Sequence, residues 1–153
     1  AEKLKPAAYR DIRSSEITRY RDESGSEVRV IAGEVGIEDK RLTGCLPAMA
    51  TSPLMLDVSV TAGRVLTLDV DDYEQVFVFA YSGGSTGFEA GQLGVFGSGD
   101  KLALQAGVAG FEALVLSGEP LREPIVQYGP FVMNRSEEIE QAIRDYQQGR
   151  LVS

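Results

Sequence analysis

Residues 118–134 read Gly-Glu-Pro-Leu-Arg-Glu-Pro-Ile-Val-Gln-Tyr-Gly-Pro-Phe-Val-Met-Asn. Pro120 and Pro124 impose extended backbone and remove ladder donors, which is typical of a strand that enters at the edge of a sheet. The run that follows is so apolar that other side chains or a partner must cover it. The stretch therefore predicts a closing strand that lies at an interface.

The residues after this stretch predict an amphipathic helix. Apolar side chains recur there at i, i+3, i+4 and i+7, namely Ile139, Ala142, Ile143 and Tyr146. We expect Asn134 to cap the helix with Glu137 three positions on, and Gly149 stands where the helix should end.

Short segments rich in Val, Leu and Phe occupy most of the remaining chain and predict β-strands. They are Glu27 to Glu34, Leu54 to Thr61, Val65 to Val70, Gln75 to Tyr81, Leu93 to Phe96, Leu102 to Ala106 and Phe111 to Leu116. Glycine-containing turn signals, such as Ala109-Gly110, separate them at spacings of roughly 10 to 12 residues. This spacing favours a sandwich or barrel over alternating βαβ units.

The stretch 118–134 resembles the closing segment of the pirin family, whose members carry two cupin barrels. Five further stretches resemble the second half of a pirin in the same order: 9–12, 28–34, 56–58, 91–96 and 137–143. Arg135-Ser136 departs from the Thr-Arg that is more typical of the family. The resemblance implies an all-β fold, a cupin-type double-stranded β-helix barrel with one C-terminal α-helix. Residues 1–130 would form the barrel, and 131–153 the closing strand and helix of the same domain.

The resemblance also implies where pirin chemistry resides. Pirins hold iron or another divalent metal in the first barrel through three histidines and a glutamate, and the second barrel carries no metal. Some members act as quercetin dioxygenases, and others are described as transcriptional co-regulators. This chain resembles the second barrel and contains no histidine. We therefore expect no cofactor in this chain, with Fe only in an N-terminal barrel outside these residues.

A cupin metal site needs a His-x-His pair after a glycine and then a glutamate. Counted from Gly63, the histidine positions fall on Asp69 and Asp71, and the glutamate position falls on Val76. Carboxylates suit Ca or Mg rather than Fe, Cu or Zn. A hard-cation site at Asp69, Asp71, Asp72 and Glu74 is one interpretation, and a solvated acidic turn is the favoured one.

The other candidate residues favour structural roles. Without histidine, Ser-His-Asp and Cys-His catalysis are excluded, and Cys45 is expected to be a packed thiol rather than a reactive one. The glycine-rich stretch 91–99 lacks the ending of a phosphate loop and is expected to be a hairpin turn. Glu119, Arg122 and Glu123 are possible ligand or rim contacts, although ion pairing at a sheet edge is the favoured interpretation.

Bulk properties limit the possible functions. With 153 residues, of which 43% are hydrophobic, the chain is long enough for one domain with a core. A net charge of −8 makes direct nucleic-acid binding improbable. No apolar run approaches the roughly 20 residues of a membrane span. The single Cys45 indicates no disulfide framework, so a cytoplasmic location is expected.

The leading hypothesis is a metal-free pirin-like C-terminal cupin domain that acts in protein interaction or structural support. It would contact an N-terminal pirin barrel, a second copy of itself or another protein. The expected interface residues are Tyr128, Phe131, Val132, Met133, Ile139, Ile143 and Tyr146. One alternative is the C-terminal part of a pirin-like quercetin 2,3-dioxygenase, with this chain not catalytic alone. A weaker alternative is small-molecule binding in the barrel interior.

Overall fold

The computed structural model describes residues 9–46 and 50–151. The chain divides into two compact units. The barrel unit spans Ile12–Glu119, and the C-terminal unit takes in Pro120–Ser153 with the first residues of the chain. Across the described ranges, no helix combines the length and hydrophobicity that crossing a membrane requires.

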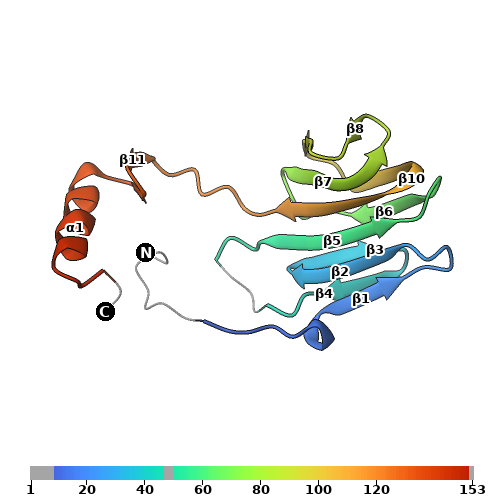
Figure 1. Ribbon diagram of the computed structural model, residues 1–153, viewed down its shortest axis with the longest axis horizontal. Coiled ribbons are helices and arrows are strands. Elements are labelled where there is room, and N and C mark those ends of the chain that lie inside the picture. The colour runs from blue at the N-terminus through green and yellow to red at the C-terminus, as the bar shows by residue number, and fades with distance from the viewer. Residues whose placement is uncertain (1–8, 47–49, 152–153) are drawn as a thin grey trace. The chain divides into compact units, whose positions relative to one another are not determined.

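Ten strands of the barrel unit form one sheet. Their bounds are β1 Thr18–Arg21, β2 Glu27–Ala32, β3 Glu34–Ile37, β4 Lys40–Thr43, β5 Leu54–Val60, β6 Val65–Asp69, β7 Val76–Ser85, β8 Phe88–Glu89, β9 Leu93–Phe96 and β10 Lys101–Ser117. The order β1-β2-β5-β10-β6-β3-β4 runs through the sheet, while β7 pairs with β10 and carries β8 and β9 on its other side. Figure 1 shows β5, β10 and β7 side by side, with β8 beyond β7.

The long strand β10 belongs to two parts of the barrel. Its first residues, from Lys101 to Gln105, pair with β6, and its last residues, from Phe111 to Ser117, lie between β5 and β7. Between them the register against β7 shifts, and Gly110 adopts a φ of +81°. A bulge of this kind bends a strand without ending it. The predicted turn at Ala109-Gly110 is therefore wrong, because the two predicted strands around it are one.

Hydrogen bonds beyond β4 bring the sheet close to closure. The N–H of Gly44 donates to the Gly33 carbonyl over 2.8 Å, and the N–H of Leu46 donates to the Ile31 carbonyl over 3.1 Å. These bonds join the segment after β4 to the end of β2. The predicted all-β barrel is thereby confirmed, and strands make up its wall almost all the way round.

Alternate side chains of the strands point inward and form one apolar core. On β5 the residues Leu54, Leu56, Val58 and Val60 are buried, and those between them are half-buried. The side chain of Phe111 is 1% exposed. Each such aliphatic or aromatic side chain contributes roughly 1.5–3 kcal/mol to folding when it leaves water. The alternation along β5 follows the predicted pattern.

The predicted strand Leu93 to Phe96 is confirmed as β9. The expected hairpin turn over residues 91–99 is therefore wrong for its middle, and a turn and a bend occur only at its two ends. Antiparallel pairing with β7 places Val95 opposite Phe77 and Leu93 opposite Phe79. The run therefore adds a strand to the sheet.

The C-terminal unit contains a hairpin and the predicted helix. The hairpin pairs β11 (Val126–Tyr128) with β12 (Phe131–Met133), and α1 spans Ser136–Gln147. The expected cap is corrected: Arg135 is the N-cap residue, and the Glu138 carboxylate accepts from the N–H groups of Asn134 and Arg135. The Asn134 side chain is used elsewhere, because its amide donates to the Pro124 carbonyl. The division into 1–130 and 131–153 of one domain stays a prediction.

Candidate functional site

The barrel interior is filled with aliphatic side chains. Val76 and Val78 on β7 and Leu66 and Leu68 on β6 are buried members of one hydrophobic cluster. A metal bound inside the barrel would need polar side chains that point inward. These four positions supply no nitrogen, oxygen or sulfur atom that could bind a metal. The interior that they line therefore does not fit an iron centre.

The three cupin ligand positions fail individually. Asp69 alternates with the buried Leu68 and Val70, so its carboxylate faces outward, where it lies 3.5 Å from the Lys101 ammonium. Asp71 is exposed in the turn after β6, and Val76 is buried and apolar. In the described part of the chain, no three His, Cys, Asp or Glu side chains gather in a way that could hold a metal ion.

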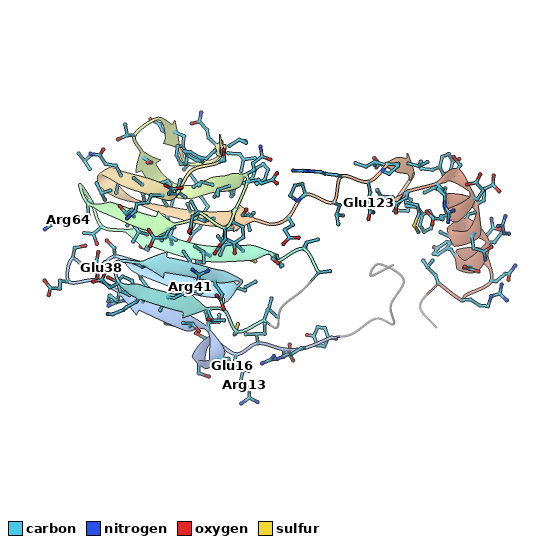
Figure 2. The ribbon with its side chains drawn as sticks, turned by 180° about the vertical axis from the view of Figure 1, so that it is seen from behind. Arg13, Glu16, Glu38, Arg41, Arg64 and Glu123 are labelled. Carbon is cyan, nitrogen blue, oxygen red and sulfur yellow. The ribbon has the colours of Figure 1, made fainter. Side chains whose placement is uncertain are left out.

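Asp72 in the acidic turn takes part in an ion pair. Asp72 pairs with Arg41 on β4, and the same guanidinium lies 3.1 Å from the Glu34 carboxylate. Arg41 is labelled in Figure 2. All three side chains are more than half exposed, so each pair contributes little, roughly 0–1 kcal/mol. This arrangement is that of a solvated turn held to the neighbouring strand.

The outward side of β7 and its neighbours carries apolar side chains that reach solvent. We call this surface the outer patch, and its members are Met55, Phe77, Phe79, Leu93, Val95, Leu114 and Leu116. Strand register makes the patch continuous, because Phe79 lies between Leu93 and Leu114. Phe79 is 38% exposed and Val95 is 56% exposed. A contiguous apolar surface of this kind is a candidate interaction site.

A polar network borders the outer patch. Asp57 lies opposite Leu114 in the sheet, accepts a 2.6 Å hydrogen bond from the Tyr81 hydroxyl and pairs with Arg29 at 3.1 Å. Arg29 also donates over 2.7 Å to Glu27, which pairs with Arg21 at 2.8 Å. Each carboxylate thus has a cationic partner, and the network gives the border of the patch a fixed polar pattern.

The network shifts the acidity of its members. Hydrogen bonds from Arg29 and then Arg21 lower the pKa of the buried Glu27 carboxyl below its usual value. Burial, followed by the hydrogen bond to Asp57, raises the pKa of the Tyr81 phenol above its usual range. Both groups therefore keep one protonation state at neutral pH, as fixed polar contacts rather than as acid–base catalysts.

The expected rim residues have separate partners within their own units. The Glu119 carboxylate accepts a 3.3 Å hydrogen bond from the Ser52 hydroxyl. Glu123, labelled in Figure 2, accepts a 3.0 Å hydrogen bond from the Asn134 amide. Arg122 has a φ of +52°, a conformation that side chains other than glycine adopt rarely. The ligand role of these three residues stays a prediction.

The expected interface residues gather in the C-terminal unit. Ile139 is buried on α1, and Phe131 on β12 packs edge-on against Tyr146 with ring centroids 6.5 Å apart. Tyr128 and Tyr146 are each 68% exposed, whereas Val132 is 38% exposed. Met133 and Ile143 are half-buried. The hairpin and the helix place these residues in one unit. Their assignment to an interface stays a prediction.

Sequence reasoning missed the outer patch. In the predicted strand Gln75 to Tyr81, both alternating sets of residues from Val76 onward are apolar. A strand that is apolar on both faces is typically covered on both faces. That signal indicates an apolar outward side of β7, but not its continuation over β9 and β10. Cys45 is half-buried with its sulfur 3.4 Å from the Ile31 carbonyl, in agreement with a packed thiol.

The chain is similar to known proteins in sequence and in structure. A family model described as the pirin C-terminal cupin domain matches residues 55–152. A Pseudomonas aeruginosa protein, whose name provisionally assigns it as a quercetin 2,3-dioxygenase, is 38% identical over 97% of this chain and 54% of its own length. Human pirin is 32% identical over 98% of this chain and 53% of its own length.

A solved structure shows the same fold. The crystal structure of a quercetin 2,3-dioxygenase from Acinetobacter baumannii matches with a TM-score of 0.85 and 32% identity, over 99% of this chain and 53% of that one. The expected cupin-type barrel is thereby confirmed. The chain spans about half the length of the curated relatives that it matches.

Proposed function

Because the chain belongs to the pirin family, as a C-terminal cupin domain, we propose that it acts in protein interaction or structural support and holds no metal of its own. The observation that carries the proposal is where the apolar side chains of the barrel lie. The interior is filled with aliphatic groups, while aromatic and aliphatic groups of the outer patch reach solvent. Among the described residues, the buried cluster of the interior is apolar, which supports a metal-free domain, and the exposed apolar side chains of the outer patch support docking.

The proposed mode of interaction uses the outer patch as its apolar centre and the Arg29, Asp57 and Tyr81 network as part of its polar rim. Interfaces with this anatomy combine a desolvated apolar middle with a hydrogen-bonded border. Aromatic residues at the middle, here Phe77 and Phe79, typically carry most of the binding energy. The cytoplasm is the proposed location, since the single Cys45 indicates no oxidising compartment.

A second candidate function is support of a dioxygenase. The Pseudomonas and Acinetobacter relatives carry quercetin 2,3-dioxygenase in their names, and about half of each lies outside the matched region. In this alternative the chain is the C-terminal part of such an enzyme, and an iron site lies in an N-terminal domain. Small-molecule binding inside the barrel receives no support, because aliphatic side chains occupy the interior positions.

Metal analysis tests the metal-free part of the proposal. The chain is purified without chelators, and Fe, Cu, Zn and Mn are quantified by mass spectrometry. We expect substoichiometric amounts of each and no turnover of quercetin by the chain alone. Stoichiometric Fe, Cu or Zn would contradict the proposal.

Coexpression tests the interaction part. The chain is coexpressed with the part of the Pseudomonas relative that lies outside the matched region, and copurification is measured. We expect Phe79→Lys to abolish copurification, because it places a charge at the middle of the outer patch. The matched control is Val65→Lys on β6, where the valine is 52% exposed. Recovery of quercetin dioxygenation in the copurified pair would favour the dioxygenase alternative.

A further inference from the structure

The strand β9 has one open edge. It pairs with β7 and, among the described residues, with no other strand. A groove of roughly 580 Å³ runs beside it and is lined by residues 86–88 and 92–96. The backbone groups that face this groove are available to another strand.

Strand register identifies those groups. The N–H of Ala80 donates over 3.0 Å to the carbonyl of Gln92, so that residue pair is hydrogen-bonded. Hydrogen-bonded and non-hydrogen-bonded pairs alternate along antiparallel strands. Leu93 opposite Phe79 and Val95 opposite Phe77 are therefore non-hydrogen-bonded pairs. The N–H and C=O groups of Leu93 and Val95 consequently point away from β7.

Charge and proline, two of the usual protections of an edge strand, are missing here. Natural edges carry lysine, proline or inward charges that block pairing with another chain. From Ala90 to Gly99 the sequence contains neither a charge nor a proline. Leu93 and Val95 are 54% and 56% exposed, and their side chains belong to the outer patch. Although each chain carries a net charge of −8, no like charges of two copies would face each other directly along this segment.

We propose that β9 pairs antiparallel with β9 of a second copy of this chain, about a two-fold axis at Gly94. In this register Leu93 lies opposite Val95 of the second copy, and the reciprocal pair follows by symmetry. All outward backbone groups of both residues are then hydrogen-bonded. Gly94 meets Gly94 of the second copy in a non-hydrogen-bonded pair, where the backbones approach most closely and the lack of a side chain gives room.

The pairing also joins apolar surface. Directly opposite residues of an antiparallel pair lie on one face, so Leu93 of one copy packs beside Val95 of the other. The two outer patches become one strip on a continuous sheet. The inference rests on the proposed interaction role and names a second copy as the partner of this edge. The interface is short, so we expect reversible, concentration-dependent association.

Sedimentation velocity over a concentration series tests the pairing. We expect the average mass of the sedimenting species to rise from that of one copy toward that of two copies as the protein concentration increases. Val95→Pro removes an outward N–H without removing a bond to β7, and Leu93→Lys adds an edge charge while leaving the backbone unchanged. Both are expected to hold the chain at the mass of one copy, while Val95→Ile keeps the association. Circular dichroism checks that each variant is folded.

Hydrogen exchange locates the contact. In the wild-type chain, the amides of Leu93 and Val95 are expected to exchange more slowly as concentration rises, whereas that of Gly94 stays unchanged. A single-copy mass at every concentration overturns the pairing, and so does an association that survives both Val95→Pro and Leu93→Lys. These outcomes are separate from metal analysis and from the effect of Phe79→Lys on coexpression, so failure of the pairing is distinguishable from failure of the proposed function.

Discussion

The hydroxyl of Tyr81 on β7 donates a 2.6 Å hydrogen bond to Oδ1 of Asp57 on β5, two strands away across β10. The other carboxylate oxygen of Asp57 lies 3.1 Å from the Arg29 guanidinium. The bond links β7 to β5 across β10, and the Arg29 ion pair extends the link to β2. It also defines where the apolar outer patch ends and its polar border begins.

Removal of this hydroxyl gives a first prediction. Tyr81→Phe keeps the ring but leaves Asp57 with one partner fewer, so we expect the free energy of unfolding to fall by about 0.5–1 kcal/mol. Chemical denaturation followed by circular dichroism measures the change. Tyr128→Phe, which removes an exposed hydroxyl from the C-terminal hairpin, serves as the matched control. An equal loss in both variants would show that the Asp57 contact contributes nothing.

The pKa of Glu27 gives a second prediction, on pH dependence. Arg29 and Arg21 lower the pKa of this carboxyl in the folded state, from an ordinary value of 4.5. The stabilisation that the ion pairs of Glu27 give the folded state is therefore complete at pH values above the ordinary pKa. It is lost as the pH falls through the lower pKa of the folded state. We expect wild type to be more stable than Glu27→Gln near neutral pH and the difference to shrink in acid.

The measurement compares unfolding curves of wild type and Glu27→Gln at several pH values. Glu23→Gln removes an exposed carboxylate nearby and controls for the change in net charge. A stability difference that stays constant between about pH 6 and pH 3 would show that the ion pairs of Glu27 do not couple folding to protonation.

Much of the fold could be predicted from the sequence, because strands with one buried face show an alternating pattern of apolar residues. Buried and half-buried residues alternate along β5 with period two. The bounds of β5 agree with the predicted strand to within one residue. β4, with the sequence Lys-Arg-Leu-Thr, was missed because it is short and mostly polar. β10 was divided in two because a glycine-rich bulge and a turn have the same local composition.

The candidate site was harder to predict, because it depends on which residues meet across strands. Phe77 and Leu116 are 39 positions apart in the numbering but are register partners. The apolar outward side of β7 could be detected in the sequence, but its continuation over β9 and β10 could not. The predicted interface in the C-terminal unit rests on an apolar run, on helical spacing and on the resemblance to pirins. The lack of histidine is the basis of the prediction that this chain holds no metal of its own, and metal analysis tests that prediction.

The helix cap gives a third prediction. The Glu138 carboxylate accepts from two backbone N–H groups, at 3.1 Å from Asn134 and 3.0 Å from Arg135. Glu138→Ala removes both bonds, so we expect the start of α1 to fray at a cost of about 1 kcal/mol. Faster amide exchange in the first turn of α1 measures this. Glu137→Ala changes the residue that the sequence pairs with Asn134 in the expected capping box, and it should have a smaller effect.

Two glycines with the same backbone conformation give a fourth prediction. Gly83 and Gly63 both have a φ of +69°, which disfavours any side chain by roughly 1–2 kcal/mol. At Gly63 an added Cβ would meet nothing within 4 Å, whereas at Gly83 it would overlap the carbonyl of Gly110 in the bulge of β10. We expect Gly63→Ala to lower the unfolding free energy by only the conformational cost. Gly83→Ala should cost several kcal/mol or prevent folding, because neither backbone can move without disturbing the pairing of β7 with β10. Thermal unfolding of both variants measures the difference, and equal losses would show that β7 and β10 are not in close contact at this bulge.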